Sequence, residues 1–148
     1  MVIELRHAGI VVTDLKRALR FYRDLLGLKI VRTMDESGPY LDNLLGLEDV
    51  RVTTVKLAPE GGGAIVELLL FQSPTAHSQA GRRIYEIGPS HVAFTVQDLD
   101  GLFQKMSRAG VRFTAPPQVS PDGLAKVAFC QDPDGAPIEL VEMLEVID

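Results

Sequence analysis

The sequence predicts an α+β fold of two tandem βαβββ modules that form a curved mixed sheet around a cleft. The first observation is an internal repeat: residues 7–15 (HAGIVVTDL) align without a gap with residues 91–99 (HVAFTVQDL) and share His, Asp and Leu. The second is that residues 64–68 (AIVEL) align in the same way with residues 136–140 (APIEL). Since the chain has 148 residues, which is the usual size of one domain, both repeats fit into a single domain.

We therefore expect one domain over residues 1–148, with module 1 at residues 1–72, a linker at residues 73–88 and module 2 at residues 89–148. The linker is predicted because this segment contains Pro, Gly, Ser and Gln and has only weak hydrophobic periodicity. An extra segment at residues 39–47 has no counterpart in the second repeat, so we interpret it as an insertion into the first.

Module 1 opens with an apolar strand, and Asp14 follows it as a good N-cap for a helix. Apolar side chains then recur at helical spacing as far as Gly27, a residue type that commonly ends helices. The insertion predicts a short amphipathic helix. The predicted strands are residues 5–12, 28–33, 51–57 and 64–71, and the glycine-rich residues 60–63 form a turn between the last two.

Module 2 repeats this pattern without the insertion. Asp98 is the expected N-cap of its helix, and Gly110 the residue that ends it. Pro116, Pro117 and Pro121 predict a loop. The predicted strands are residues 90–96, 111–114, 124–130 and 136–141, with a turn at residues 132–135 (DPDG).

Composition excludes several classes of function. The net charge of −5 offers no basic surface for nucleic acid or an anionic membrane. No apolar stretch approaches the roughly 20 residues that a membrane span requires, and the N-terminus lacks the features of a signal peptide. Cys130 is the only cysteine, which favours a cytoplasmic location. Because it lies in an apolar run, we predict that Cys130 is a buried small residue rather than a nucleophile.

Each repeat supplies one histidine in its first strand and one glutamate in its last, namely His7 with Glu67 and His91 with Glu139. Both glutamates lie among apolar residues, where an unpaired carboxylate is costly. Imidazole and carboxylate are good ligands for divalent Zn, Ni, Co, Mn or Fe, and two glutamates would balance the charge of the ion. Other interpretations are that each histidine is structural, that each glutamate pairs with Arg or Lys, or that a gene duplication copied structural residues. The two matched pairs favour one bound divalent metal ion.

The motifs at both ends of the chain resemble those of the vicinal oxygen chelate superfamily. They are His7 with residues 14–27 (DLKRALRFYRDLLG), and residues 129–140 (FCQDPDGAPIEL). Members include glyoxalase I, methylmalonyl-CoA epimerase, extradiol dioxygenases, fosfomycin-modifying enzymes and bleomycin-binding proteins. The resemblance implies the metal ligands His7, Glu67, His91 and Glu139, in an order that resembles bacterial glyoxalase I.

The presence of Glu67 favours the lyase and isomerase branch, because extradiol dioxygenases and fosfomycin enzymes do not use a ligand at that position. The segment at residues 71–75 (FQSPT) and the insertion differ from the glyoxalase pattern, which argues against glutathione conjugates as substrates.

We accordingly expect a metal-dependent lyase or isomerase that acts on a small substrate with vicinal oxygens through a metal-stabilised enediolate. Glu139 is the expected base, with Glu67 as its counterpart in proton transfer. Tyr40 and Leu44 of the insertion are expected to contact the substrate, and the resemblance implies a homodimer. The alternatives are an iron-dependent extradiol-type dioxygenase that uses His7, His91 and Glu139, and a drug- or metabolite-binding protein without chemistry.

Overall fold

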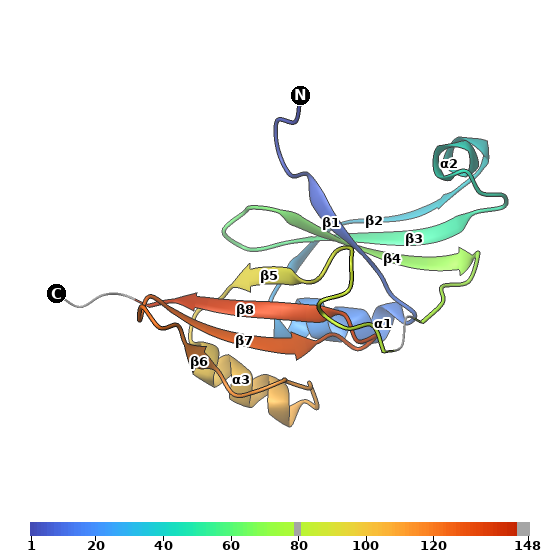
Figure 1. The fold of residues 1–148 in the computed structure, drawn as a ribbon. Coiled ribbons are helices and arrows are strands. Elements are labelled where there is room, and N and C mark those ends of the chain that lie inside the picture. Colours follow the sequence, from blue (N-terminus) through green and yellow to red (C-terminus); the bar gives the residue numbers. More distant parts are fainter. Residues whose placement is uncertain (79–80, 145–148) are drawn as a thin grey trace. The chain divides into compact units, whose positions relative to one another are not determined.

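The chain forms two compact units in the computed structural model, Met1–Ser78 and Gln79–Asp148 (Figure 1). The structure describes residues 1–78 and 81–144. Residues 79–80 of the predicted linker and residues 145–148 of the predicted module 2 lie outside the described residues.

The first unit contains one mixed four-stranded sheet in the order β1-β4-β3-β2. Strands β1 and β4 are parallel, whereas β3 is antiparallel to both of its neighbours. The elements are β1 (His7–Val11), α1 (Leu15–Leu19), the π-helix η1 (Arg20–Leu25), β2 (Lys29–Ser37), α2 (Pro39–Leu45), β3 (Arg51–Ala58) and β4 (Ile65–Ser73).

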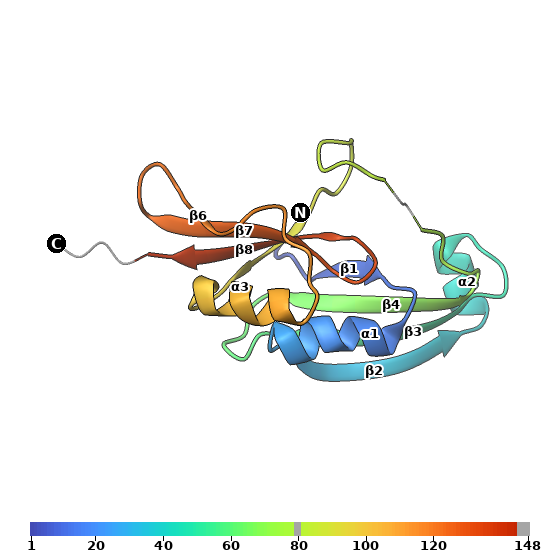
Figure 2. The same cartoon turned by 90° about the horizontal axis from the view of Figure 1, so that it is seen from below.

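The hydrophobic core of this unit lies between the helix α1–η1 and one face of the sheet (Figure 2). Phe21 and Tyr22 come from the helix, and Val66 and Leu68 come from β4; all four are buried. Burial of each large apolar side chain contributes roughly 1.5–3 kcal/mol to folding. Because side chains alternate along a strand, Glu67 projects from the opposite face of β4, away from this core.

The second unit repeats the arrangement, with the strand order β5-β8-β7-β6 and a parallel β5–β8 pair. Helix α3 packs against β7 and β8, and its buried Leu99 and Met106 meet a core that includes Ile138 and Leu140. The elements are β5 (Val92–Thr95), α3 (Leu99–Arg108), β6 (Gln118–Val119), β7 (Ala125–Gln131) and β8 (Pro137–Met143). The α+β class and the two tandem βαβββ modules are therefore confirmed.

The predicted helix ends are also confirmed. The Asp14 carboxylate accepts a hydrogen bond from the backbone N–H of Arg17 at 2.9 Å, and the Asp98 carboxylate accepts one from Gly101 at 3.1 Å. Gly27 follows the first helix with a φ of 80° and Gly110 follows α3 with a φ of 88°, a conformation that glycine adopts without strain.

The predicted strand at residues 111–114 is wrong. Phe113 makes a single isolated bridge with Cys130, and the edge strand of this sheet is instead β6, inside the predicted loop. Pro116 and Pro117 explain the difference, because proline has no backbone N–H to donate to the ladder with β7. Pairing therefore stops after the bridge and resumes at Gln118, which pairs with Val127.

Cys130 is a buried core residue, as predicted. Burial, together with the nearby Asp132 carboxylate, raises the pKa of its thiol to about 12. The thiol thus stays protonated near neutral pH, which excludes the nucleophilic thiolate. Among the described residues, no helix is both long and apolar enough to cross a membrane.

Candidate functional site

In the first unit, His7 and Glu67 face each other from the two parallel strands. The register pairs Glu67 with Gly9, so His7 lies two residues along β1 on the same face of the sheet. His7 Nε2 is 3.9 Å from Glu67 Oε1, and the Glu67 side chain is only 14% exposed. A Cβ added at Gly9 would lie only 3.3 Å from Leu69 Cδ1, so the absence of a side chain lets β1 pack closely against β4 at this position.

The second unit holds the equivalent pair, His91 and Glu139. Here Glu139 of β8 pairs with Ala93 of β5, and His91 immediately precedes β5. His91 Nε2 is 3.0 Å from Glu139 Oε2, and the Glu139 side chain is 22% exposed. The edge of the imidazole meets the ring of Phe129, with 5.1 Å between the ring centroids.

The hydrogen bonds around Ser90 indicate which nitrogen of His91 carries the proton. The Ser90 hydroxyl donates to the backbone carbonyl of Ile84 at 3.0 Å. Its oxygen is therefore an acceptor toward His91 Nδ1, which lies 3.1 Å away. In the neutral imidazole Nδ1 then carries the hydrogen, and Nε2 points a free lone pair at the Glu139 carboxylate.

His91 Nε2 and Glu139 Oε2 each direct a lone pair at the other across 3.0 Å, and this contact is favourable only with a proton or a cation between the two atoms. Ligand atoms that share one ion at about 2.1 Å lie roughly 3.0–3.4 Å apart. The separations of 3.0 Å in the second unit and 3.9 Å in the first are close to this range. The donor chemistry and spacing of each His–Glu pair therefore fit a divalent transition-metal ion.

The predicted ligands come together as two pairs, His7 with Glu67 and His91 with Glu139. Within residues 1–78 and 81–144, no group of three or more His, Cys, Asp or Glu side chains gathers at one point. Each pair is thus half of the predicted four-ligand set.

Lys56 is a residue of the site that the sequence interpretation missed. It pairs with Glu67 in the β3–β4 register, and its Nζ lies 3.4 Å from Glu67 Oε2. The Lys56 side chain is 27% exposed. The turn at residues 60–63 could have revealed this neighbour, because a hairpin closed by that turn sets the pairing of the two strands.

Tyr40 and Leu44 lie on α2, at the end of β2 (Figure 1). Both are exposed, Tyr40 to 79%. Ser37, the last residue of β2, pairs with Arg51 of β3. Arg51 is five residues from Lys56 along the same strand, so α2 begins roughly 17 Å from Lys56. A contact of these side chains with the substrate stays a prediction.

Comparisons with known proteins identify the family of the chain and agree with its fold. Residues 4–140 match the family model described as the Glyoxalase/Bleomycin resistance protein/Dioxygenase superfamily. A probable lactoylglutathione lyase of Synechocystis is 30% identical over 93% of this chain and 94% of its own length. A lactoylglutathione lyase of Escherichia coli O157:H7 is also 30% identical, over 95% of this chain and 93% of its own. A glyoxalase family protein from Bacillus cereus has a similar fold, with a TM-score of 0.87 at 22% identity over 98% of this chain and 97% of that one.

Proposed function

The chain belongs to the Glyoxalase/Bleomycin resistance protein/Dioxygenase superfamily, the vicinal oxygen chelate proteins, and from this premise we propose that it is a metal-dependent lyase or isomerase. The substrate is a small molecule with two adjacent oxygen atoms. The names of the relatives at 30% identity, which are lactoylglutathione lyases, support the lyase class.

One divalent ion, of Zn, Ni, Co, Mn or Fe, binds to His7, Glu67, His91 and Glu139. The observation that carries this proposal is the repeated pairing of a histidine Nε2 with a glutamate carboxylate, 3.9 Å apart in one unit and 3.0 Å in the other. When bound, such an ion would supply Lewis acidity toward two adjacent substrate oxygens and make the neighbouring C–H bond more acidic.

Glu139 is the residue that takes the proton from that carbon. Among the described residues, no lysine or arginine forms an ion pair with it, whereas Lys56 occupies one oxygen of Glu67. The Ser90 hydroxyl fixes the His91 ring, and this ring in turn faces the Glu139 carboxylate. Glu67 is the counterpart of Glu139 on the other side of the reacting carbon. A positioned general base of this kind contributes about 10²–10⁴-fold to the rate.

Metal analysis followed by proton exchange tests this function. The purified protein should contain one divalent ion per chain, and it should catalyse exchange of the C–H proton in D₂O for some member of a panel of α-hydroxy and α-keto compounds. Removal of the metal should abolish exchange, and its return should restore it. Metal-free protein that still binds such a compound tightly, with no exchange in either form, would instead indicate a metabolite-binding protein.

A second candidate function is an iron-dependent extradiol-type dioxygenase. The Lys56–Glu67 ion pair favours it, because a glutamate with its own counter-ion leaves His7, His91 and Glu139 as the 2-His-1-carboxylate set of such enzymes. Iron as the bound metal, together with oxygen uptake in the presence of a catechol, would support this candidate. Proton exchange without oxygen uptake would exclude it.

We also propose a cytoplasmic location. Cys130 is the only cysteine in the sequence, so the chain forms no internal disulfide, which fits a reducing compartment. Fractionation of cells that express a tagged chain tests this location.

A further inference from the structure

A row of charged side chains crosses the sheet of the first unit beside the His7–Glu67 pair. The register pairs Arg32 of β2 with Lys56 of β3, and Lys56 with Glu67 of β4. Directly paired residues project from the same face of a sheet. The row therefore places two positive charges next to a single carboxylate.

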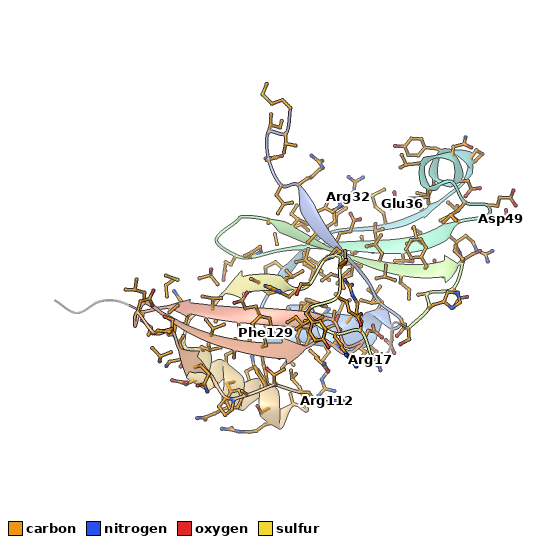
Figure 3. All side chains as sticks on the ribbon, in the orientation of Figure 1. Arg17, Arg32, Glu36, Asp49, Arg112 and Phe129 are labelled. Atoms are coloured by element: carbon orange, nitrogen blue, oxygen red, sulfur yellow. The ribbon has the colours of Figure 1, made fainter. Side chains whose placement is uncertain are left out.

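Arg32 is the surplus cation of this row. Among the described residues it has no ion-pair partner, whereas Lys56 already pairs with Glu67. Figure 3 shows Arg32 and Glu36 on one side of the sheet and Arg17 of α1 on the other. Glu36 is four residues further along β2, and its carboxylate accepts a hydrogen bond from the Thr54 hydroxyl at 3.1 Å. Like charges directly opposite each other destabilise a sheet. The Arg32–Lys56 pair therefore does not contribute to the stability of the fold, which favours a role in binding.

The equivalent row of the second unit shows that the fold does not require these cations. Glu139 pairs there with Phe129 of β7 (labelled in Figure 3) and with Ala93 of β5. The position of Lys56 is thus taken by an aromatic ring in an otherwise matching module. Charge compensation of Glu67 alone would account for Lys56, but it leaves Arg32 without a role.

We propose that Lys56, supported by Arg32, recognises an anionic carboxylate group of the substrate beside the metal site. This inference rests on the proposed metal ligands, because an ion bound to Glu67 takes over the charge that Lys56 otherwise neutralises. The ammonium and the guanidinium then face the site without a counter-ion. A substrate whose adjacent oxygens bind the metal and whose neighbouring carbon carries a carboxylate supplies that counter-ion.

Binding of two small probes to the zinc-loaded protein tests this inference without any turnover. Glycolate and tartronate both present a hydroxyl next to a carboxylate, and tartronate adds a second carboxylate on the same carbon. Calorimetric titration gives the ratio of their dissociation constants for the unchanged protein, which should favour tartronate. Lys56→Met should reduce this preference about tenfold, as expected for the loss of a charge-assisted hydrogen bond, and should leave glycolate binding nearly unchanged.

Three further variants make the outcome decisive. Lys56→Arg should keep the preference, because it keeps the charge. Arg32→Met should lower it by a smaller factor, and since Arg32 is an exposed residue this variant tests the inference even if Lys56→Met fails to fold. Lys126→Met is the matched control, because Lys126 also lies on the third strand of its module but binds Asp100, and in the sheet it pairs with Glu142 rather than with Glu139. It should leave the preference unchanged.

The inference is overturned if Lys56→Met and Arg32→Met bind zinc and keep the full preference for tartronate. Failure of the unchanged protein to bind zinc is a different result, since it removes the proposed metal site and this inference together. The two failures are distinguished by the zinc titration that precedes the addition of either probe.

Discussion

Glu67 and Glu139 occupy equivalent places in the two modules, yet their neighbours differ. Lys56 pairs with the first glutamate and Phe129 with the second. The sequence repeat predicted both glutamates and both histidines, because identical residues recur at matching places in the two repeats. The repeat could not predict Lys56, because it breaks the symmetry and becomes visible only in the pairing of neighbouring strands.

Because Lys56 forms an ion pair with Glu67 and not with Glu139, we assign the proton transfer to Glu139, and Glu139→Gln tests this assignment. Glutamine still offers an oxygen to a metal ion but cannot accept a proton, so this variant should keep its metal and lose turnover by about 10²-fold or more. Metal content and steady-state rates measure the two effects separately. Glu60→Gln, in the exposed turn of module 1, is the control and should change neither. Full activity of Glu139→Gln with full metal content would remove the assignment of the base.

Ser90 orients a predicted metal ligand. Its hydroxyl accepts a hydrogen bond from His91 Nδ1, which leaves the lone pair of His91 Nε2 available for a metal ion. Removal of the partner of a metal-binding histidine typically costs 10–100-fold in metal affinity. Ser90→Ala should therefore weaken metal binding by roughly that factor, measured by competition with a chelator. Ser107→Ala, on the exposed side of α3, is the matched control. Equal affinities of the two variants would show that Ser90 does not position His91.

At the scale of the elements, local rules predicted most of the structure. Alternation and apolar runs located seven of the eight strands that the described part of the chain contains, and the aspartate caps located the starts of two helices. Two features depend on interactions that these rules do not include. The helix after Asp14 continues from Arg20 as a π-helix. The backbone N–H of Leu26 donates there to the carbonyl oxygen of Phe21, five residues earlier, instead of the four residues of an α-helix. The edge strand β6 lies beyond the two prolines that interrupt the ladder with β7.

Helix α2 has no counterpart among the described residues of module 2, and we predict that it contacts the substrate. None of its residues is buried, whereas Asp42 anchors the following loop by accepting hydrogen bonds from the backbone of Asp49 and Val50. The double variant Tyr40→Ser and Leu44→Ser keeps this anchor. Its free energy of unfolding should change by no more than about 0.5 kcal/mol, as is usual for exposed positions.

The same double variant should shift the relative kcat/KM values for different substrates. Comparison of the unchanged protein and the variant over a panel of at least two active substrates measures this shift. Identical preferences would show that α2 has no part in substrate recognition.

At the scale of the whole molecule, we predict that two chains associate, as the family resemblance implies. Each chain has a mass of 16.2 kDa. Light scattering on the protein eluting from a size-exclusion column should therefore give twice this mass at micromolar concentration. A mass of one chain under these conditions would contradict the homodimer.

The relation between the two modules is also a property of the whole molecule. The repeat predicts that each module brings one His–Glu pair, and the structure shows both pairs. Convergence of the two pairs on one ion is not a local property of either repeat, since it depends on how the modules or the chains assemble. The proposed function depends on this convergence of the two pairs on one ion, and the number of metal ions bound per chain tests it most directly.

The decisive measurement is the number of zinc ions bound per chain by the unchanged protein, by His7→Ala and by His91→Ala. If the four ligands share one ion, the unchanged protein binds one ion per chain and each variant loses most of it, because each ion depends on a histidine from both modules. If the pairs act independently, the unchanged protein binds two ions per chain and each variant keeps one. That second result, or an unchanged protein that binds no zinc, would contradict the shared metal site.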